Sequence, residues 1–385
     1  MATTTVASSN KVTRFQEKVR REYVRGGRFG PFIGPDQNKI IQTNRNLKKT
    51  SIALVGKLSG GGVSGSTQLS GAEESLSNYA FTTQPTYWRN GVLIDQEERE
   101  LSEFDLFTEA RPALMNWTME KKRDQTIQAL GSLEAGGTYY NYGGSEGAFG
   151  STAASAGNMD TWNTNNQDRV LYGAAKSNNN SGNHTTSLAN IDTTNDKLDA
   201  PMVTLMKRMA EQASPLIRPV SVNNDEPFYV FFVDPYGFRD LQTDSTIAQA
   251  NREARPRAVM ENPLFTGGDL FYNGVIIKKI PEIATFIDGD SSGSPWDAAW
   301  GSNATGDSLA TSGNGTSRVG VGFLCGAQAV AFGIGRMASF KRRKEDDYEH
   351  LTGVGVAMKH DIKGIFYNDK QHGKFTTFFS AAVDS

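Results

Sequence analysis

The stretch from Ser51 to Leu93 reads SIALVGKLSGGGVSGSTQLSGAEESLSNYAFTTQPTYWRNGVL, and its pattern sets the interpretation of the whole chain. The apolar run Ser51–Leu58 predicts one strand, and Tyr79–Leu93 predicts a second extended segment. The residues between them are mostly glycine and serine with two acids. Two strands around a glycine-rich tip predict a long hairpin.

The length of this hairpin exceeds what the chain can cover by itself. A compact chain of 385 residues has a radius of gyration of about 21 Å. Limbs of about 20 residues could reach on the order of 65 Å when extended. An isolated hairpin is marginal in water, so we expect this one to contact a neighbouring molecule.

The candidate contact residues lie at the hairpin tip, where glycines make the backbone adaptable. They are Gly60, Gly61, Gly62, Gly65, Gly71, Glu73 and Glu74. Glycines 60, 62 and 65 also match the dinucleotide-binding string, but the following STQLSG has no helical face, so a hairpin tip is the better interpretation.

Other motifs that could support chemistry do not form a catalytic group. The nucleophile-elbow strings at Gly143–Gly147 and Gly289–Gly293 lie in low-complexity loops, where Gly and Ser produce them by chance. Asp288, Asp290 and Ser292 imitate a calcium loop whose twelfth position is Ala299 instead of Glu. One cysteine, Cys325, excludes an internal disulfide, and with only His184, His350, His360 and His372 it excludes a Cys/His zinc site. We predict no enzyme, no cofactor and no metal.

The charge of the chain is unevenly distributed. The total is −2, yet the first fifty residues hold eleven Lys or Arg against Glu17, Glu22 and Asp36, a net charge of +8. Val12–Tyr23 predicts a short basic helix ended by Gly26-Gly27. Such an arm suggests DNA or an acidic neighbouring surface as its partner, with a solvated tail as the alternative. Its candidate residues are Arg14, Lys18, Arg20, Arg21, Arg25 and Arg28.

The remaining pattern predicts an α+β fold without internal repeats. A helical region of about 30 residues begins near Ser102, with a kink or a fresh start at Pro112. Later elements are a helix from Pro201, a buried strand at Phe228–Val233 and a helix from Pro235 to about Ala254, followed by a hairpin turning at Asn273-Gly274 and strands from Arg318 onward. The stretches 136–196 and 288–316 are rich in small polar residues and hold too few aliphatics to form a core, so we expect them outside the core, at the exterior. No apolar run has transmembrane length, and there is no signal peptide, which fits a soluble intracellular product.

The order of these elements resembles that of the major capsid proteins of tailed bacteriophages, which have the Hong Kong 97 fold. The podovirus family named after phage N-four is the most similar. The matching stretches are KKTSIALVGKLSGGGVSGSTQLSGAEE (48–74), Phe104–Trp117, YVFFVDPYGFRDL (229–241), NPLFTGGDLFYNGV (262–275), FLCGAQAVAF (323–332) and the acidic segment after Lys344.

The resemblance implies a division of the chain. Residues 1–50 would form the N-terminal arm, 51–90 the E-loop hairpin and 91–135 the spine helix of the peripheral domain. A Gly/Asn/Ser/Thr-rich insertion would occupy 136–199. The axial domain would span 200–320, including the insertion 288–316, and 321–385 would supply strands that return to the peripheral domain.

The resemblance also implies a function. Such subunits form pentamers and hexamers of an icosahedral virion shell around double-stranded DNA, assembled in the host bacterial cytoplasm. The implied partners are other copies of the chain, packaged DNA held by non-specific charge, and a portal protein, with no membrane. About 50 residues before the hairpin are too few for a large fused scaffolding domain, so we expect a separate scaffolding protein or none, besides a possible decoration protein. The alternatives are a soluble carbohydrate-binding or adhesin-like module, suggested by loops rich in Asn, Thr, Tyr and Trp, and a hydrolase.

Overall fold

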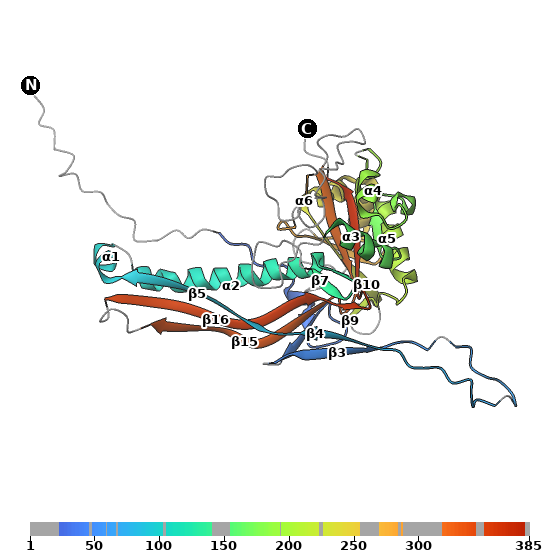
Figure 1. Cartoon of the computed structure of the whole chain (residues 1–385). Coiled ribbons are helices and arrows are strands. Elements are labelled where there is room, and N and C mark those ends of the chain that lie inside the picture. Colours follow the sequence, from blue (N-terminus) through green and yellow to red (C-terminus); the bar gives the residue numbers. More distant parts are fainter. Residues whose placement is uncertain are drawn as a thin grey trace, which may run out of the picture. The chain divides into compact units, whose positions relative to one another are not determined.

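The computed structural model describes residues 23–45, 48–58, 60–66, 68–102, 105–140, 155–192, 194–222, 226–254, 269–283, 286–287, 318–343 and 350–381 (Figure 1). The chain divides into two compact units. Unit 1 comprises Met1–Gly27, Tyr87–Lys122 and Arg336–Lys359, and unit 2 comprises Arg28–Thr86, Arg123–Gly335 and His360–Ser385. The mixture of helices and sheets confirms the predicted α+β class.

A mixed sheet forms the centre of unit 2. Its strand order is β11 (Leu270–Tyr272), β12 (Val275–Lys279), β10 (Glu226–Val233), β14 (Arg318–Cys325), β19 (Lys374–Ser380) and β8 (Val170–Tyr172), while β9 (Val220–Val222) pairs with β10 and β13 (Phe286–Ile287) pairs with β14. Strand β19 therefore lies between β14, which is antiparallel to it, and β8, which is parallel. The turn between β11 and β12 has positive φ at Asn273 and Gly274, as the hairpin prediction required.

Strand β10 is buried on both faces and separates two apolar layers. Val230 and Phe232 pack into one layer, and Phe231 and Val233 pack into the other, because successive side chains point to opposite faces. The first layer includes residues of α3 (Ala156–Asn165) and α4 (His184–Ala189). The second is covered by α5 (Ala200–Gln212), α6 (Pro235–Thr243) and α7 (Ser245–Ala254).

The single helix expected from Pro235 to Ala254 is wrong, because the structure has two. Asp244 separates α6 from α7 with an extended backbone, and its carboxylate accepts the N–H groups of Thr246 and Ile247 at 2.7 and 3.2 Å. An aspartate in this position ends one helix and starts the next. The predicted helix at Pro201 is confirmed as α5, whose N-cap Asp199 accepts the Met202 N–H.

A five-stranded sheet has the order β1 (Ile33–Gly34), β2 (Ile41–Arg45), β15 (Val330–Arg343), β16 (Leu351–Gly364) and β5 (Thr86–Asp95). A 3-10 turn, η2 (Gly30–Phe32), precedes β1. The sequence did not predict β1 and β2, which lie in the stretch assigned to the arm. Short strand pairs β17 (Phe366–Tyr367) with β18 (Lys370–Gln371), and β6 (Leu133–Ala135) with β7 (Thr138–Tyr140), complete the smaller sheets.

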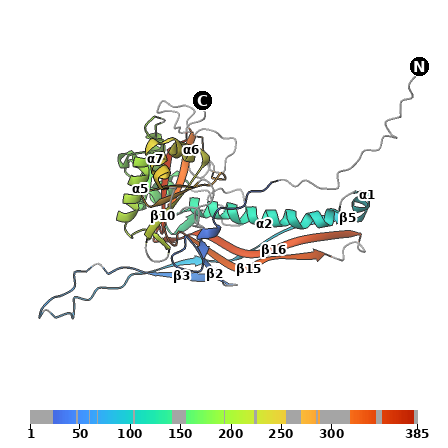
Figure 2. The same cartoon turned by 180° about the vertical axis from the view of Figure 1, so that it is seen from behind.

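Unit 1 has its own small core beside α2 (Leu106–Gly131), a helix preceded by the short α1 (Gln96–Leu101). Within this unit α2 lies along β5, β15 and β16 (Figures 1 and 2), and Leu114 packs with Ile94, Val354 and Val356. The helix is continuous through Pro112, so the fresh start that the proline allowed is not seen.

The expectation that residues 136–196 stay outside the core is wrong for their described part. Residues 155–192 form α3, β8, the 3-10 turn η3 (Lys176–Asn178) and α4, and Trp162 and Tyr172 are fully buried. Polar side chains order this region by capping its helices: Ser155 caps α3 and Asn183 caps α4. The stretch 288–316 and the predicted helix at Val12–Tyr23, apart from Tyr23, lie outside the described residues.

Candidate functional site

The predicted hairpin is formed by β3 (Thr50–Val55) and β4 (Asn78–Thr83). The two strands pair antiparallel from Thr50 opposite Thr83 to Val55 opposite Asn78, and the Gly56 N–H donates to the Ser77 carbonyl at 2.8 Å. Of the about 20 residues expected in each limb, the ladder pairs six. The second limb ends at Thr83, and the chain then enters β5, which belongs to the five-stranded sheet.

The base of the hairpin packs on apolar residues of unit 2, whereas the described residues of its loop are exposed. Ile52 and Leu54 of β3 and Phe81 of β4 pack on a small apolar cluster with Ala331 and Ile365 in unit 2. From Lys57 to Ser77, every residue whose burial the structure describes is exposed. The loop extends beyond the paired strands in Figure 1.

The two glutamates of the tip are used within the loop. Glu74 accepts the Gly60 N–H at 2.7 Å and so joins the two limbs, while Glu73 accepts the Gly71 N–H at 2.6 Å. A Cβ at Gly60 would lie 2.8 Å from the Glu74 carboxylate, so a larger residue there would displace the end of this side chain. Gly62, Gly65 and Gly71 have positive φ, whereas nothing in the structure requires glycine at Gly61.

The hairpin also presents apolar side chains that sequence reasoning missed. Leu58, Leu69 and Leu76 are 55%, 56% and 61% exposed. Their exposure could have been predicted from the sequence, because large aliphatic residues in a loop rich in glycine and serine lie far from the core of their own chain. Several such residues close together are typical of a contact surface.

Unit 1 presents a second group of exposed apolar side chains. They are Tyr23, Tyr87, Val92, Leu93, Leu101, Met115, Met119 and Met337. Met115 and Met119 are four residues apart and therefore share one face of α2. Leu93 and Arg343 both lie close to Gly353, so apolar and basic groups occur together on one face of the strands of this unit.

The predicted basic arm is described only in part. Arg25 and Arg28 are exposed, as an arm that binds a partner requires. Arg14, Lys18, Arg20 and Arg21 lie outside the described residues.

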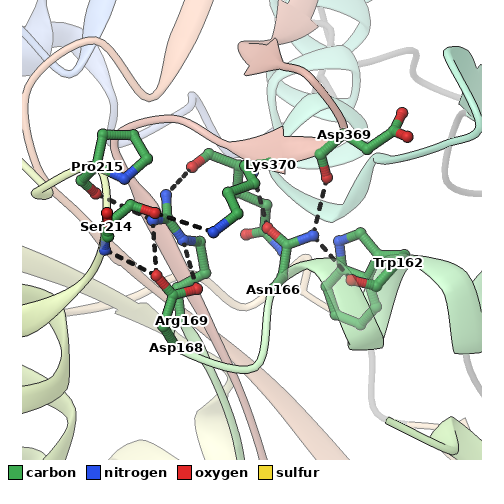
Figure 3. Close-up of polar contacts among 9 residues, drawn as sticks. Trp162, Asn166, Asp168, Arg169, Ser214, Pro215, Asp369 and Lys370 are labelled. Carbon is green, nitrogen blue, oxygen red and sulfur yellow. Dashed lines mark hydrogen bonds and ion pairs between the residues drawn. The ribbon is translucent and has the colours of Figure 1, made fainter. Parts of the chain in front are cut away.

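A buried polar network holds the segment before β8 against the C-terminal strands of unit 2 (Figure 3). The fully buried Arg169 side chain contacts Asp168 at 3.0 and 3.2 Å and donates to the backbone carbonyls of Gln371 and Pro215. Asp168 also accepts the Ser214 N–H at 2.8 Å. Burial alone would raise the pKa of Asp168, but Arg169 and the Ser214 N–H together hold it below its usual value. We assign this network a role in stability and not in ligand binding, because its polar groups form hydrogen bonds with one another.

The histidines and the cysteine that could support catalysis or metal binding do not form a group in the described part of the structure. His360 bonds Gln125 at 2.5 Å inside unit 2, and His350 lies 3.2 Å from Asp95 in unit 1. Burial raises the pKa of the Cys325 thiol to about 12. Among the described residues, no three His, Cys, Asp or Glu side chains are grouped closely enough to hold a metal ion. Both nucleophile-elbow strings and the calcium-like loop lie outside the described residues.

The described helices include none with the length and apolar character needed to cross a membrane. A shallow pocket of about 480 Å³ in unit 2 is lined by Lys207, Glu211, Leu216, Arg218 and Tyr229, among others. Its ionisable groups do not form a catalytic set.

Comparison with known proteins gives consistent results. Residues 3–375 match the family model described as phage capsid protein. The chain is 26% identical over 351 residues to the major capsid protein of Pseudomonas phage KPP25, covering 85% of this chain and 81% of that protein. The capsid asymmetric unit of cyanophage Pam1 is 34% identical with a TM-score of 0.83, and the capsid of Ralstonia phage GP4 is 17% identical with a TM-score of 0.67; both alignments cover 100% of each chain.

The structural likeness confirms the Hong Kong 97-like fold that the resemblance implied. The family match spans nearly the whole chain, including the hairpin, α2 and every described strand before β19. The chain therefore belongs to the phage capsid protein family.

Proposed function

We propose that the chain is the major capsid subunit of a tailed phage and that its copies assemble into the shell of the virion. In this proposal, pentamers and hexamers tile an icosahedral head that encloses double-stranded DNA. The observation that supports it most directly is the loop from Gly56 to Ser77, whose leucines are more than half exposed. Neighbouring copies would cover these side chains.

The energetics favour assembly through many copies rather than through one strong contact. Fully burying an exposed leucine side chain contributes about 1.5–3 kcal/mol. When only two subunits associate, their loss of translational and rotational freedom offsets most of this free energy. A closed shell repeats the contact for every subunit, so modest contacts become collectively strong. The glutamates contribute mainly to the shape of the tip, since they accept hydrogen bonds from their own loop.

The basic arm would face DNA or an acidic surface of a neighbouring subunit. Its net charge of +8 over the first fifty residues supports this placement, and Arg25 and Arg28 are exposed. The same proposal includes the assignments 51–90 to the E-loop and 200–320 to the axial domain, assembly in the host cytoplasm, a portal protein, and separate scaffolding or decoration proteins. It assigns no catalytic step to the chain.

A carbohydrate-binding module is not favoured. That alternative rested on aromatic side chains in loops rich in Asn and Thr, which could stack on sugar rings. Trp162 and Tyr172, two of the aromatics in the stretch 136–196, are fully buried in the core of unit 2 and cannot stack on a ligand.

The test shortens the hairpin without disturbing its base. Residues 57–76 are replaced by Asn-Gly, so that the bond between Gly56 and Ser77 is kept, and a matched control keeps the loop length but carries Leu58→Ser, Leu69→Ser and Leu76→Ser. We expect both variants to give the circular dichroism spectrum of the wild type, because the altered side chains are exposed. In sedimentation and negative-stain microscopy, the wild type should form particles and both variants should remain monomers or loose capsomers. Normal particles from the shortened chain would overturn the assembly role of the hairpin.

A further inference from the structure

The hairpin is joined to the five-stranded sheet by only two residues on its C-terminal side. Strand β4 ends at Thr83 in the pairing with β3, and β5 begins at Thr86 in the other sheet. Gln84 and Pro85 therefore carry the chain from one sheet to the other. Proline has no backbone N–H, so the ladder is interrupted at this point.

A single carboxylate satisfies the backbone of this connection. The Gln84 N–H donates to Asp361 Oδ2 at 2.8 Å, across 277 positions of sequence. Asp361 belongs to β16 and is fully buried. Lys363 Nζ lies 3.6 Å from the same oxygen, and the other oxygen, Oδ1, has no hydrogen-bond partner among the described residues.

The connection is also packed tightly against β15. A Cβ built on Gly333 would lie 3.4 Å from both the Pro85 ring and the Thr83 hydroxyl. Thr83 and Pro85 are themselves buried. Two strands therefore hold the backbone between the hairpin and the sheet: β16 through the hydrogen bond from Gln84 to Asp361, and β15 through the packing of Gly333 beside Pro85.

The surroundings of Asp361 disfavour its charged form. Burial raises the pKa of this carboxyl group, although Lys363 and the Gln84 N–H oppose the shift. A raised pKa means that the ionised group is less favourable in the folded chain than in the unfolded chain. What the carboxylate does contribute at this connection is the hydrogen bond that it accepts from the Gln84 N–H.

We propose that Asp361 is a positioning residue that fixes the direction in which the hairpin leaves the sheet. Its carboxylate orients the Gln84 peptide and, through Pro85 and Thr83, the first pair of the β3–β4 ladder. The inference builds on the proposed function, since a fixed direction matters only if the hairpin must meet a neighbouring copy. It is nevertheless tested on single subunits.

The experiment measures the hairpin direction by pulsed electron spin resonance. Spin labels are attached at Ser64→Cys in the exposed loop and at Ser177→Cys in η3, both within unit 2. The native Cys325 is buried with a raised pKa and should not react with the label. Labelled chains are diluted into unlabelled chains so that distances between copies do not contribute.

Three variants separate the acceptor from the charge. Asp361→Ala removes the acceptor and should broaden the distance distribution, with at least about a tenfold loss of protection of the Gln84 amide from hydrogen exchange. Asp361→Asn keeps a side-chain oxygen and should restore a narrow distribution. Lys363→Gln removes the cation beside Asp361 but keeps the acceptor, so its distribution should stay narrow. Thermal unfolding should show that all three variants are folded.

A narrow, unshifted distribution and an unchanged Gln84 amide in Asp361→Ala would overturn the proposal. Equal broadening in Asp361→Asn would overturn it as well, because the charge and not the hydrogen bond would then be responsible. Neither readout depends on assembly. Failure of the hairpin to mediate assembly would instead appear in the shortened-loop test, with the spin-label distances of the single subunit unaffected.

Discussion

Lys374 in β19 is a fully buried lysine that caps the end of α2. Its ammonium nitrogen donates to the carbonyl oxygens of Leu130 at 2.8 Å and Ser132 at 2.7 Å, and it lies over the Phe366 ring. Carbonyls at a helix C-terminus lack partners within the helix, so a cation fits this position. Burial nevertheless lowers the pKa of Lys374 to about 7, since the charged form is desolvated.

We expect Lys374 to make the stability of the protein depend on pH between about 7 and 9. In this window the unfolded lysine still binds a proton that the folded one releases, so the free energy of unfolding rises with pH, by up to about 2 kcal/mol. Above pH 9 the Cys325 thiol opposes the rise, because its folded pKa is about 12. Urea unfolding at several pH values should show the slope in the wild type and in Lys176→Met, an exposed control, but not in Lys374→Met. An unchanged slope in Lys374→Met would contradict the assignment.

The network around Arg169 makes a second prediction for a single residue. Arg169→Met leaves Asp168 and two carbonyls without their buried cation, so the free energy of unfolding should fall by about 3–5 kcal/mol. Lys370→Met in the same network removes only one hydrogen bond to the Ser214 carbonyl and should cost about 0.5–1.5 kcal/mol. Chemical denaturation measures both values. Equal losses in the two variants would show that burial of Arg169 is not the decisive factor.

At the level of elements, the segment 155–192 is expected to reject insertions. Asn179 and Asn163 exchange two amide hydrogen bonds, at 3.1 and 3.0 Å, and so join η3 to α3. A composition rich in small polar residues by itself favours tolerance of a short, exposed tag near Asn179. The structure leads to the opposite expectation: a tag at Asn179 should lower the melting temperature markedly or prevent folding. The same tag inserted after Ser64 in the hairpin loop should leave the subunit folded. Equal melting temperatures would refute the structural role of this segment.

The basic arm makes a prediction about salt. Changing Arg14, Lys18, Arg20 and Arg21 to Gln should weaken binding of duplex DNA to the purified subunit. It should also reduce the slope of log K against log salt by about 3–4, because each lost phosphate contact removes about 0.9. Fluorescence anisotropy between about 50 and 200 mM salt measures the slope. The control changes Lys341, Arg342 and Arg343 of β15, a similar loss of charge elsewhere. An unchanged slope in the arm variant would favour a neighbouring subunit as the arm's partner.

Elements with a strong local signal could be predicted from the sequence, and those that depend on distant partners could not. The Asn273-Gly274 hairpin and α5 have turn and capping residues at the required positions. Strand β8 has only three residues, and its place beside β19 is set by pairing across about 200 positions. Strands β1 and β2 are also short, and β2 pairs with β15, which lies far along the chain. Long-range pairing leaves no periodicity in a short segment.

At the scale of the whole molecule, exposed apolar side chains are concentrated in two places. All the large exposed apolar residues of the described chain except Leu216 belong to the hairpin or to unit 1. We expect Met115→Gln with Met119→Gln to change the free energy of unfolding by less than about 0.5 kcal/mol, because both side chains are exposed. The same pair should reduce the yield of particles in sedimentation, whereas Ala113→Gln, on another face of α2, should not. Full particle yield from the double variant would remove this face from the assembly surface.

The candidate site was predicted in outline but not in its contacts. Glycine and serine content indicated the hairpin tip, and the exposed tip residues agree with that placement. The intrachain bonds of Glu73 and Glu74 and the connection through Asp361 were not predictable, because they depend on side-chain geometry and on a strand 277 positions away. Whether the tip meets another copy is a property of several chains, which one sequence does not encode in a local pattern.

The place of β19 between β14 and β8 has a consequence for protein synthesis. Of the strands in this sheet, β19 leaves the ribosome last, and its neighbours wait with unpaired edges until it arrives. A chain that terminates before Lys374 lacks the strand that joins β8 to β14, and we expect its core to stay accessible to chaperones and proteases. We therefore expect incomplete translation products to be degraded as single chains. Only full-length copies, in which β19 completes the sheet, would then reach assembly, and the assembled shell would contain no truncated subunits.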